Sequence, residues 1–144
     1  MSVVADRLSR THMDVSDFML TKYYFDQICK KFGTPVVDLF ATYQTKQCKK
    51  FNSWKPDQLG FYAFPPFNLV GKVISKIIIE KSKGIVVASH WSTQPWFSLF
   101  QKLAVSEILI FGPNKRLLFN HYSREYHQIN PSLQLMVAIL SGNQ

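Results

Sequence analysis

The chain alternates between short apolar runs and longer stretches in which apolar residues recur at helical spacing. The runs predict buried strands, because a strand that is covered on both faces is apolar throughout its length. These runs are residues 35–41, 60–66, 84–91 and 107–111, and a fifth candidate strand at 115–119 follows the Gly112–Pro113 turn. Gly and Pro at the ends of the runs indicate the turns between the elements.

Helical spacing predicts helices in the intervening segments. Residues 16–32 place Phe18, Phe25, Ile28, Cys29 and Phe32 on one face, and Gly33 followed by Pro35 ends this helix. A second helix is capped by Asn68, places Val70, Val73, Ile74, Ile77 and Ile78 on one face, and ends at Gly84. A third opens at Thr93 and turns Trp96, Phe97, Phe100 and Leu103 inward. Alternating strands and helices predict an α/β domain with a mostly parallel sheet and helices on both faces.

Composition agrees with one packed domain of an intracellular protein. The chain has 144 residues, of which 47% are hydrophobic, enough to fill a single core. Its apolar runs are shorter than the ~18 residues of a membrane span, and Asp6, Arg7 and Arg10 are unlike a signal peptide. Cys29 and Cys48 lack metal-ligand spacing. We therefore expect reduced thiols, no metal site, no membrane partner and a cytoplasmic or nuclear location.

The net charge of +8 favours nucleic acid as a partner. Lysines interleaved with aromatic residues, as phosphate contacts combined with base stacking require, occur in residues 46–55. The candidate nucleic-acid-binding residues are Lys46, Lys49, Lys50, Phe51, Trp54 and Lys55. A solvated, solubilising face is the alternative for this cluster. That alternative is favoured for Lys72 and Lys76, which are the exposed positions opposite an apolar helical stripe.

Ligands of parallel sheets gather beyond the carboxyl ends of the strands. Three sets of residues are expected at that edge: Asp38 with Phe40 and Ala41, the Pro65-Pro66-Phe67 turn, and Ser89-His90-Trp91. His90 is a candidate general base, but the sequence offers it no evident carboxylate partner, and a lone His after a buried strand is more often a packed, neutral ring.

Several longer motifs resemble the segment that follows ribonuclease H in the polyproteins of tyrosine-recombinase (DIRS-type) retrotransposons. They are "DLFAT", "AFPPF" and "TQPWF", and the likeness covers nearly the whole chain. At the ends, "VVADRLSR" resembles the close of ribonuclease H, and "MVAILSGN" resembles the linker before the recombinase. The resemblance implies a ribonuclease H remnant at residues 1–13, a domain at 14–130 and a C-terminal linker at 131–144. Asp6 alone resembles a ribonuclease H carboxylate, and one carboxylate cannot hold two metal ions.

The same segment is similar to phage-type DNA adenine-N6 methyltransferases. This similarity implies a single three-layer, Rossmann-like (methyltransferase-like) domain. Asp38, Phe40 and Ala41 would lie near the S-adenosylmethionine pocket, while Cys48 and Phe51 would follow the position of the NAKC motif. Pro65, Pro66 and Phe67 would form the catalytic NPPY or NPPF turn, in which a flipped adenine meets hydrogen-bond acceptors and an aromatic ring.

Two positions depart from the enzymes. Phe64 stands where Asn or Asp supplies the side-chain acceptor, and Thr45 stands in place of the Asn of NAKC. We therefore expect a non-catalytic module that binds nucleic acid, either DNA or an RNA–DNA hybrid, or that has a structural role, with no resident cofactor. The reverse transcriptase/ribonuclease H and recombinase portions of the same element are candidate partners. The alternative is an active S-adenosylmethionine-dependent DNA N6-adenine methyltransferase.

Overall fold

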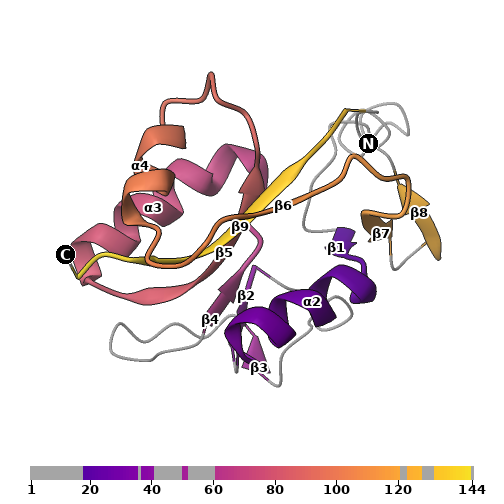
Figure 1. Ribbon diagram of the computed structural model, residues 1–144, viewed down its shortest axis with the longest axis horizontal. Helices are drawn as coiled ribbons and strands as arrows, with labels where there is room; N and C mark the ends of the chain where they lie inside the picture. The colour runs from indigo at the N-terminus through magenta and orange to yellow at the C-terminus, as the bar shows by residue number, and fades with distance from the viewer. Residues whose placement is uncertain are drawn as a thin grey trace, which may run out of the picture.

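The computed structural model describes residues 18–35, 37–40, 50–51, 61–120, 123–127 and 132–143. In these ranges the chain forms a six-stranded sheet, a three-stranded sheet and helices packed on the larger sheet (Figure 1). The strands are β1 (Phe18–Leu20), β2 (Val37–Leu39), β3 (Lys50–Phe51), β4 (Phe61–Ala63), β5 (Lys83–Ser89), β6 (Leu109–Phe111), β7 (Leu118–Asn120), β8 (Glu125–His127) and β9 (Leu135–Ser141). The helices are α2 (Lys22–Phe32), the 3₁₀ turn η2 (Phe67–Leu69), α3 (Val70–Glu80) and α4 (Phe97–Leu103). No described helix has both the length and the apolar character needed to span a bilayer.

The large sheet is mixed, with the strand order β3-β2-β4-β5-β9-β6. Its first four strands are parallel, whereas β9 runs antiparallel to both β5 and β6. The antiparallel pairings are the longer ones: β9 matches seven residues of β5 and three of β6, while the parallel pairings match two, three and three. The predicted single Rossmann-like domain with a mostly parallel sheet is therefore wrong.

The main source of this error is β9. Residues 131–144 are predicted to be a C-terminal linker, but residues 135–141 form a strand between β5 and β6, and every residue of it except Ile139 is buried. Apolar side chains on both faces of β9 explain its interior position, since only a strand covered on both sides hides them from water. The last part of the chain is therefore integral to the sheet.

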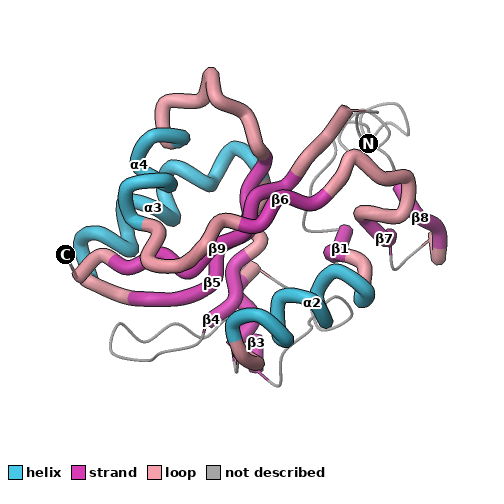
Figure 2. Tube along the Cα trace, viewed as in Figure 1, coloured by secondary structure: helices cyan, strands magenta, loops and turns pink. Residues whose placement is uncertain are grey.

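Helices cover both faces of the large sheet (Figure 2). We call the two resulting clusters the α2-side core and the α3/α4-side core. The α2-side core contains Phe25 and Ile28 of α2 against Tyr62, Ile85, Val87 and Val137 of the sheet. The α3/α4-side core contains Val73, Ile74, Ile77, Phe100 and Leu103 against Phe61, Val86, Ala88, Met136 and Ala138. Alternate residues of β4, β5 and β9 thus enter opposite cores, as the two-residue period of a strand requires.

Several predicted element boundaries are corrected by the structure. Residues 18–20 are not helical but form β1, which pairs with β7. Asn68 lies within η2, and no side-chain cap hydrogen bond forms at the start of either η2 or α3. Helix α3 ends before Lys81, which takes a left-handed conformation with φ of 52°, while Gly84 belongs to β5. Ile78, expected inside, is 39% exposed.

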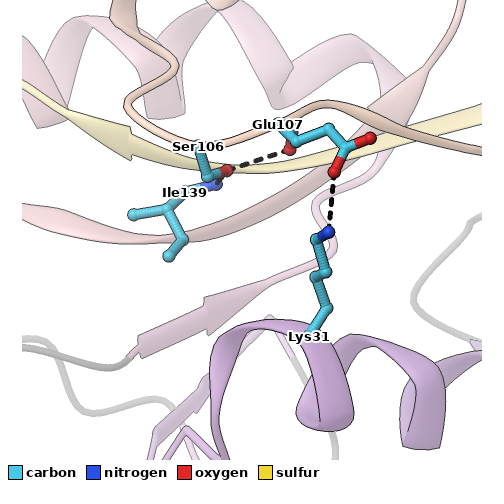
Figure 3. A network of polar contacts seen from close by, with 4 residues as sticks. All are labelled: Lys31, Ser106, Glu107 and Ile139. Atoms are coloured by element: carbon cyan, nitrogen blue, oxygen red, sulfur yellow. Dashed lines mark hydrogen bonds and ion pairs between the residues drawn. The ribbon is translucent and has the colours of Figure 1, made fainter.

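The approach to β6 contains an irregular segment that is held by a serine hydroxyl (Figure 3). Ala104 bridges to Leu140, and the regular ladder resumes only where Leu109 faces Val137. Between these points the Ser106 hydroxyl accepts the backbone N–H of Ile139 at 2.9 Å and donates to the Glu107 carbonyl at 3.0 Å. In a regular ladder a backbone carbonyl would accept the Ile139 N–H. Here the Ser106 hydroxyl accepts it instead, as side chains do where a β-bulge disrupts the ladder.

The small sheet has the order β1-β7-β8 and is antiparallel throughout. The fifth candidate strand, predicted at 115–119, corresponds to β7 at 118–120, but it belongs to this sheet and not to the large one. The inner side of the small sheet joins the α2-side core through Phe18, Leu20 and Leu118.

Candidate functional site

The carboxyl ends of β2, β4 and β5 lie at one edge of the large sheet. Leu39 is opposite Ala63, so β2 and β4 finish side by side, whereas β5 continues past Val86, the partner of Ala63, to Ser89. Beyond β4 and β5 the expected convergence is confirmed, because Phe67 contacts Trp91. The residues that follow them are Phe40, the segment 64–67 and His90-Trp91, whereas Ala41 lies outside the described residues.

The proline turn after β4 is formed. Pro66 is extended, with φ of −51° and ψ of 145°, and its carbonyl accepts the Leu69 N–H at 2.8 Å. This bond closes the 3₁₀ turn that carries Phe67. The half-buried Phe67 ring then meets the Trp91 ring edge to face, with centroids 5.0 Å apart and an interplanar angle of 72°. An aromatic pair from two strand ends therefore stands at the edge.

The side chain that precedes the prolines is buried. Phe64 is 8% exposed and belongs to the α2-side core with Phe25 and Tyr62.

The two candidate cofactor residues that the structure describes, Asp38 and Phe40, lie in different environments. Asp38 lies within β2, paired in register with Phe51 on one side and Tyr62 on the other, and is only 3% exposed. Its carboxylate is thus not presented to solvent at the edge. Phe40 has a positive φ of 65°, an uncommon conformation for a residue with a side chain, and its ring packs against the α3/α4-side core.

His90 is exposed beyond the end of β5. Its backbone N–H donates to the Gln134 carbonyl at 2.9 Å, and its ring lies 5.4 Å from that of Phe97. Among the described residues His90 makes no ion pair with a carboxylate. The same part of the chain contains no group of three or more His, Cys, Asp or Glu residues that could hold a metal ion. Within the described ranges, His90 thus lies at the edge with no carboxylate partner that would orient it as a general base.

The lysine and aromatic cluster at residues 46–55 cannot be placed as a surface. Lys46, Lys49, Trp54 and Lys55 lie outside the described residues, and of the remaining two only the backbone strand β3 is described. The nucleic-acid prediction for this cluster remains a prediction.

The structure brings together a second basic and aromatic group, which was not among the candidates predicted from the sequence. Phe119 of β7 and Tyr126 of β8 pack with centroids 5.5 Å apart, and the guanidinium groups of Arg116 and Arg124 lie over these rings. Residues 115–126, "KRLLFNHYSREY", already show this group in the sequence, because basic and aromatic residues interleave there as they do in residues 46–55. Only the pairing of β7 with β8, however, puts the two rings together.

No protein-family model matches the chain, and a comparison with curated proteins finds no significant match.

Proposed function

We propose that this chain binds nucleic acid at the edge where β2, β4 and β5 end and that it does not transfer a methyl group there. The observation that carries the proposal is the burial of Phe64 in the α2-side core, directly before a turn whose Phe67 packs against that core but remains half-buried. The proline turn resembles the catalytic turn of DNA adenine methyltransferases. The chain differs from those enzymes because position 64 has no side-chain acceptor.

The chemistry of methyl transfer explains why one side chain matters. An adenine amino group must be held by directed acceptors while its nitrogen attacks the methyl carbon, and a phenylalanine ring in the core cannot accept that hydrogen bond. Loss of one directed polar group at a reacting centre lowers rates by about 10²–10³ in comparable cases. The proline turn is formed, but it lacks the side-chain acceptor that methyl transfer requires.

Base binding makes smaller demands than base chemistry. An aromatic ring stacks on any base, an interaction worth about 1–3 kcal/mol. Phe67 and Trp91, which pack against the α2-side core and are half-buried, are the rings proposed for this role. The exposed Lys72 in the first turn of α3 follows the proline turn closely, and the whole chain carries a net charge of +8. The aromatic rings beside the strand ends and the excess of positive charge together suit a nucleic acid whose bases are accessible.

The resemblance to retrotransposon polyproteins narrows the ligand and the partners. DNA or an RNA–DNA hybrid is the proposed ligand, and the reverse transcriptase/ribonuclease H and recombinase portions of the same element are the proposed neighbours. The competing function is an active S-adenosylmethionine-dependent DNA N6-adenine methyltransferase, which the intact Pro65-Pro66-Phe67 turn favours.

The test combines binding and transfer assays on the whole chain. Fluorescence anisotropy with labelled single-stranded DNA, duplex DNA and RNA–DNA hybrid should show salt-dependent binding. Incubation with S-adenosylmethionine that carries a labelled methyl group should leave the DNA unlabelled, and calorimetric titration with the cofactor should show no heat. Labelled DNA produced by the unmodified protein would overturn the proposal in favour of the enzyme.

Trp91→Leu tests whether the edge is the binding surface, because Leu keeps apolar volume while removing the ring. Removal of one stacked ring should weaken binding about 5- to 100-fold. The matched control is Ile79→Ala, since Ile79 is 79% exposed in the last turn of α3, before the chain enters β5 from the opposite edge of the sheet. Equal affinity of the two variants would refute binding at this edge.

A further inference from the structure

The small sheet has an outer face on which apolar side chains form a row across its three strands. Met19 of β1 is opposite Phe119 of β7, and Phe119 is opposite Tyr126 of β8. Their neighbours Phe18, Leu20 and Leu118 are buried in the α2-side core. Because successive side chains of a strand point to opposite faces, the row Met19-Phe119-Tyr126 faces away from that core.

Two arginines flank this row from opposite ends of β7. Arg116, just before the strand, has its Cζ atom 5.5 Å from the centre of the Tyr126 ring. Arg124, in the turn that follows, has its Cζ atom 5.9 Å from the centre of the Phe119 ring. The rings themselves are 5.5 Å apart and inclined at 71°. Arginine and aromatic side chains thus alternate along one surface.

The turn that carries Arg124 is held in place by the backbone. Arg124 adopts a left-handed φ of 61°, and its N–H donates to the Asn120 carbonyl at 2.8 Å. The Asn120 side-chain oxygen also accepts the Ser123 N–H at 3.0 Å. At the other end, the backbone N–H of Thr21 donates to the Leu117 carbonyl at 3.0 Å and joins the loop before β7 to the start of α2. The arginines therefore extend from fixed points.

When a guanidinium group stacks over an aromatic ring, its N–H groups point outward in the guanidinium plane. They therefore remain available for hydrogen bonds to phosphate. Arg116 and Arg124 are exposed, and among the described residues neither forms an ion pair with a carboxylate. Tyr126 is 48% exposed. The one acidic residue of β8, Glu125, alternates with Tyr126 and is paired in register with Asn120. The face combines open ring surface with cations available to a phosphate.

We propose that the outer face of the small sheet binds single-stranded nucleic acid, with bases stacked on Phe119 and Tyr126 and phosphates held by Arg116 and Arg124. The exposed Lys115 adds a further cation beside Arg116. Single strands are the favoured ligand because duplex bases are stacked on each other and hide the ring faces that an aromatic side chain needs. The inference rests on the proposed nucleic-acid binding, names single strands as the ligand class, and adds a second contact surface to the Trp91 edge.

Two variants with matched controls test the surface by fluorescence anisotropy, with labelled oligothymidylate and a hairpin duplex of equal length as probes. Tyr126→Leu should weaken oligothymidylate binding about 5- to 100-fold and change duplex binding less than about twofold. Its control is Tyr23→Leu, because Tyr23 is also an exposed aromatic residue, at 65%, but lies on α2. Arg124→Gln should reduce the slope of log affinity against log salt by about 0.7, whereas Lys102→Gln on α4 should reduce it less.

Photochemical crosslinking of the unmodified protein to oligothymidylate gives a readout that does not depend on variant folding. Mass spectrometry should find the crosslinked bases on the peptide that contains Phe119 and Tyr126. Unchanged oligothymidylate affinity in Tyr126→Leu, an equal loss in Tyr23→Leu, or crosslinks confined to other peptides would each overturn the proposal. If binding is lost in Trp91→Leu alone, the edge proposal stands and this one fails; if the chain binds no nucleic acid, both fail.

Discussion

The ring of Phe61 lies against the backbone of Gly84, so that a Cβ atom at position 84 would approach the Cδ2 atom of that ring to 2.3 Å. The two residues are directly opposite one another in the parallel pairing of β4 with β5. The glycine therefore makes room for a ring that is only 2% exposed in the α3/α4-side core. Its place in β5 reflects close packing and not a helix end.

Gly84→Ala should lower the free energy of unfolding by about 1–3 kcal/mol, the usual cost of an overpacked core. Urea denaturation followed by tryptophan fluorescence measures the change. Gly71→Ala is the matched control, because a Cβ there would meet Trp96 at an ordinary 3.6 Å and because Ala is favoured over Gly in the helix α3. A loss of stability in the control as large as that in Gly84→Ala would contradict this account.

Ser106→Ala should destabilise the irregular segment before β6. The Ile139 N–H, part-buried, would lose the hydroxyl that accepts it at 2.9 Å, and an unmatched donor costs about 1–3 kcal/mol. Amide hydrogen exchange at Ile139 should accelerate together with the fall in unfolding free energy. Ser98→Ala, at an exposed position of α4, should change stability by less than about 0.5 kcal/mol. Unchanged exchange at Ile139 would show that the hydroxyl is dispensable.

The exposed ion pair between Lys31 and Glu107 should be visible in the titration of the carboxyl group. The hydrogen bond from Lys31 Nζ, at 2.7 Å, and the charge of that ammonium group hold the pKa of Glu107 below its ordinary value (Figure 3). Because the folded-state pKa is lowered, the stabilisation is present above the ordinary pKa and is lost as the pH falls through the folded value.

NMR titration of the Glu107 side chain should give a midpoint below the ordinary range, and Lys31→Met should raise it toward that range. At neutral pH the same variant should lose only a small amount of stability, since both side chains are about half exposed or more and solvent screens the pair. A midpoint that does not move in Lys31→Met would assign the lowered pKa to some other group.

Phe64→Asn would restore the side chain that the methyltransferase motif has before its prolines. Because Phe64 is buried in the α2-side core, we expect a loss of about 3–5 kcal/mol in unfolding free energy and no gain of methyl transfer. Phe64→Leu, which keeps the position apolar, should lose less. Denaturation curves and transfer of a labelled methyl group to DNA measure the two effects, and a folded Phe64→Asn protein that methylates DNA would show that only one group separates the chain from an enzyme.

The lysine cluster at residues 46–55 leads to a separate prediction. If these lysines neutralise phosphates, replacing both Lys49 and Lys50 by Ala should flatten the salt dependence of DNA binding, by about 0.9 in slope for each duplex phosphate that is no longer neutralised. Anisotropy titrations across a salt series measure the slope. An unchanged slope in the double variant would indicate that these lysines form a solvated, solubilising face and do not contact phosphates.

The sequence by itself determined those elements whose periodicity is strong and local. The strands around Tyr62, Val86 and Ile110 and the helical stripe from Val70 to Ile77 lie where the apolar pattern places them. The pattern suffices there because each segment is long enough to bury one face or both wherever it finally packs. The meeting of the strand ends beside Phe67 and Trp91 also followed from the pattern, since parallel neighbours end at the same edge.

Tertiary structure decided the rest, because direction and pairing depend on partners far away in the chain. Phe18–Leu20 is a strand only because it pairs with Leu118–Asn120. The apolar run of β9 fits a buried strand, but the resemblance assigned it to a linker, and only the fold places it between β5 and β6. The same holds for function: interleaved arginine and aromatic residues are common in sequence. The pairing of Phe119 with Tyr126 places their rings on one outward face, and the chain on either side of β7 brings an arginine over each ring.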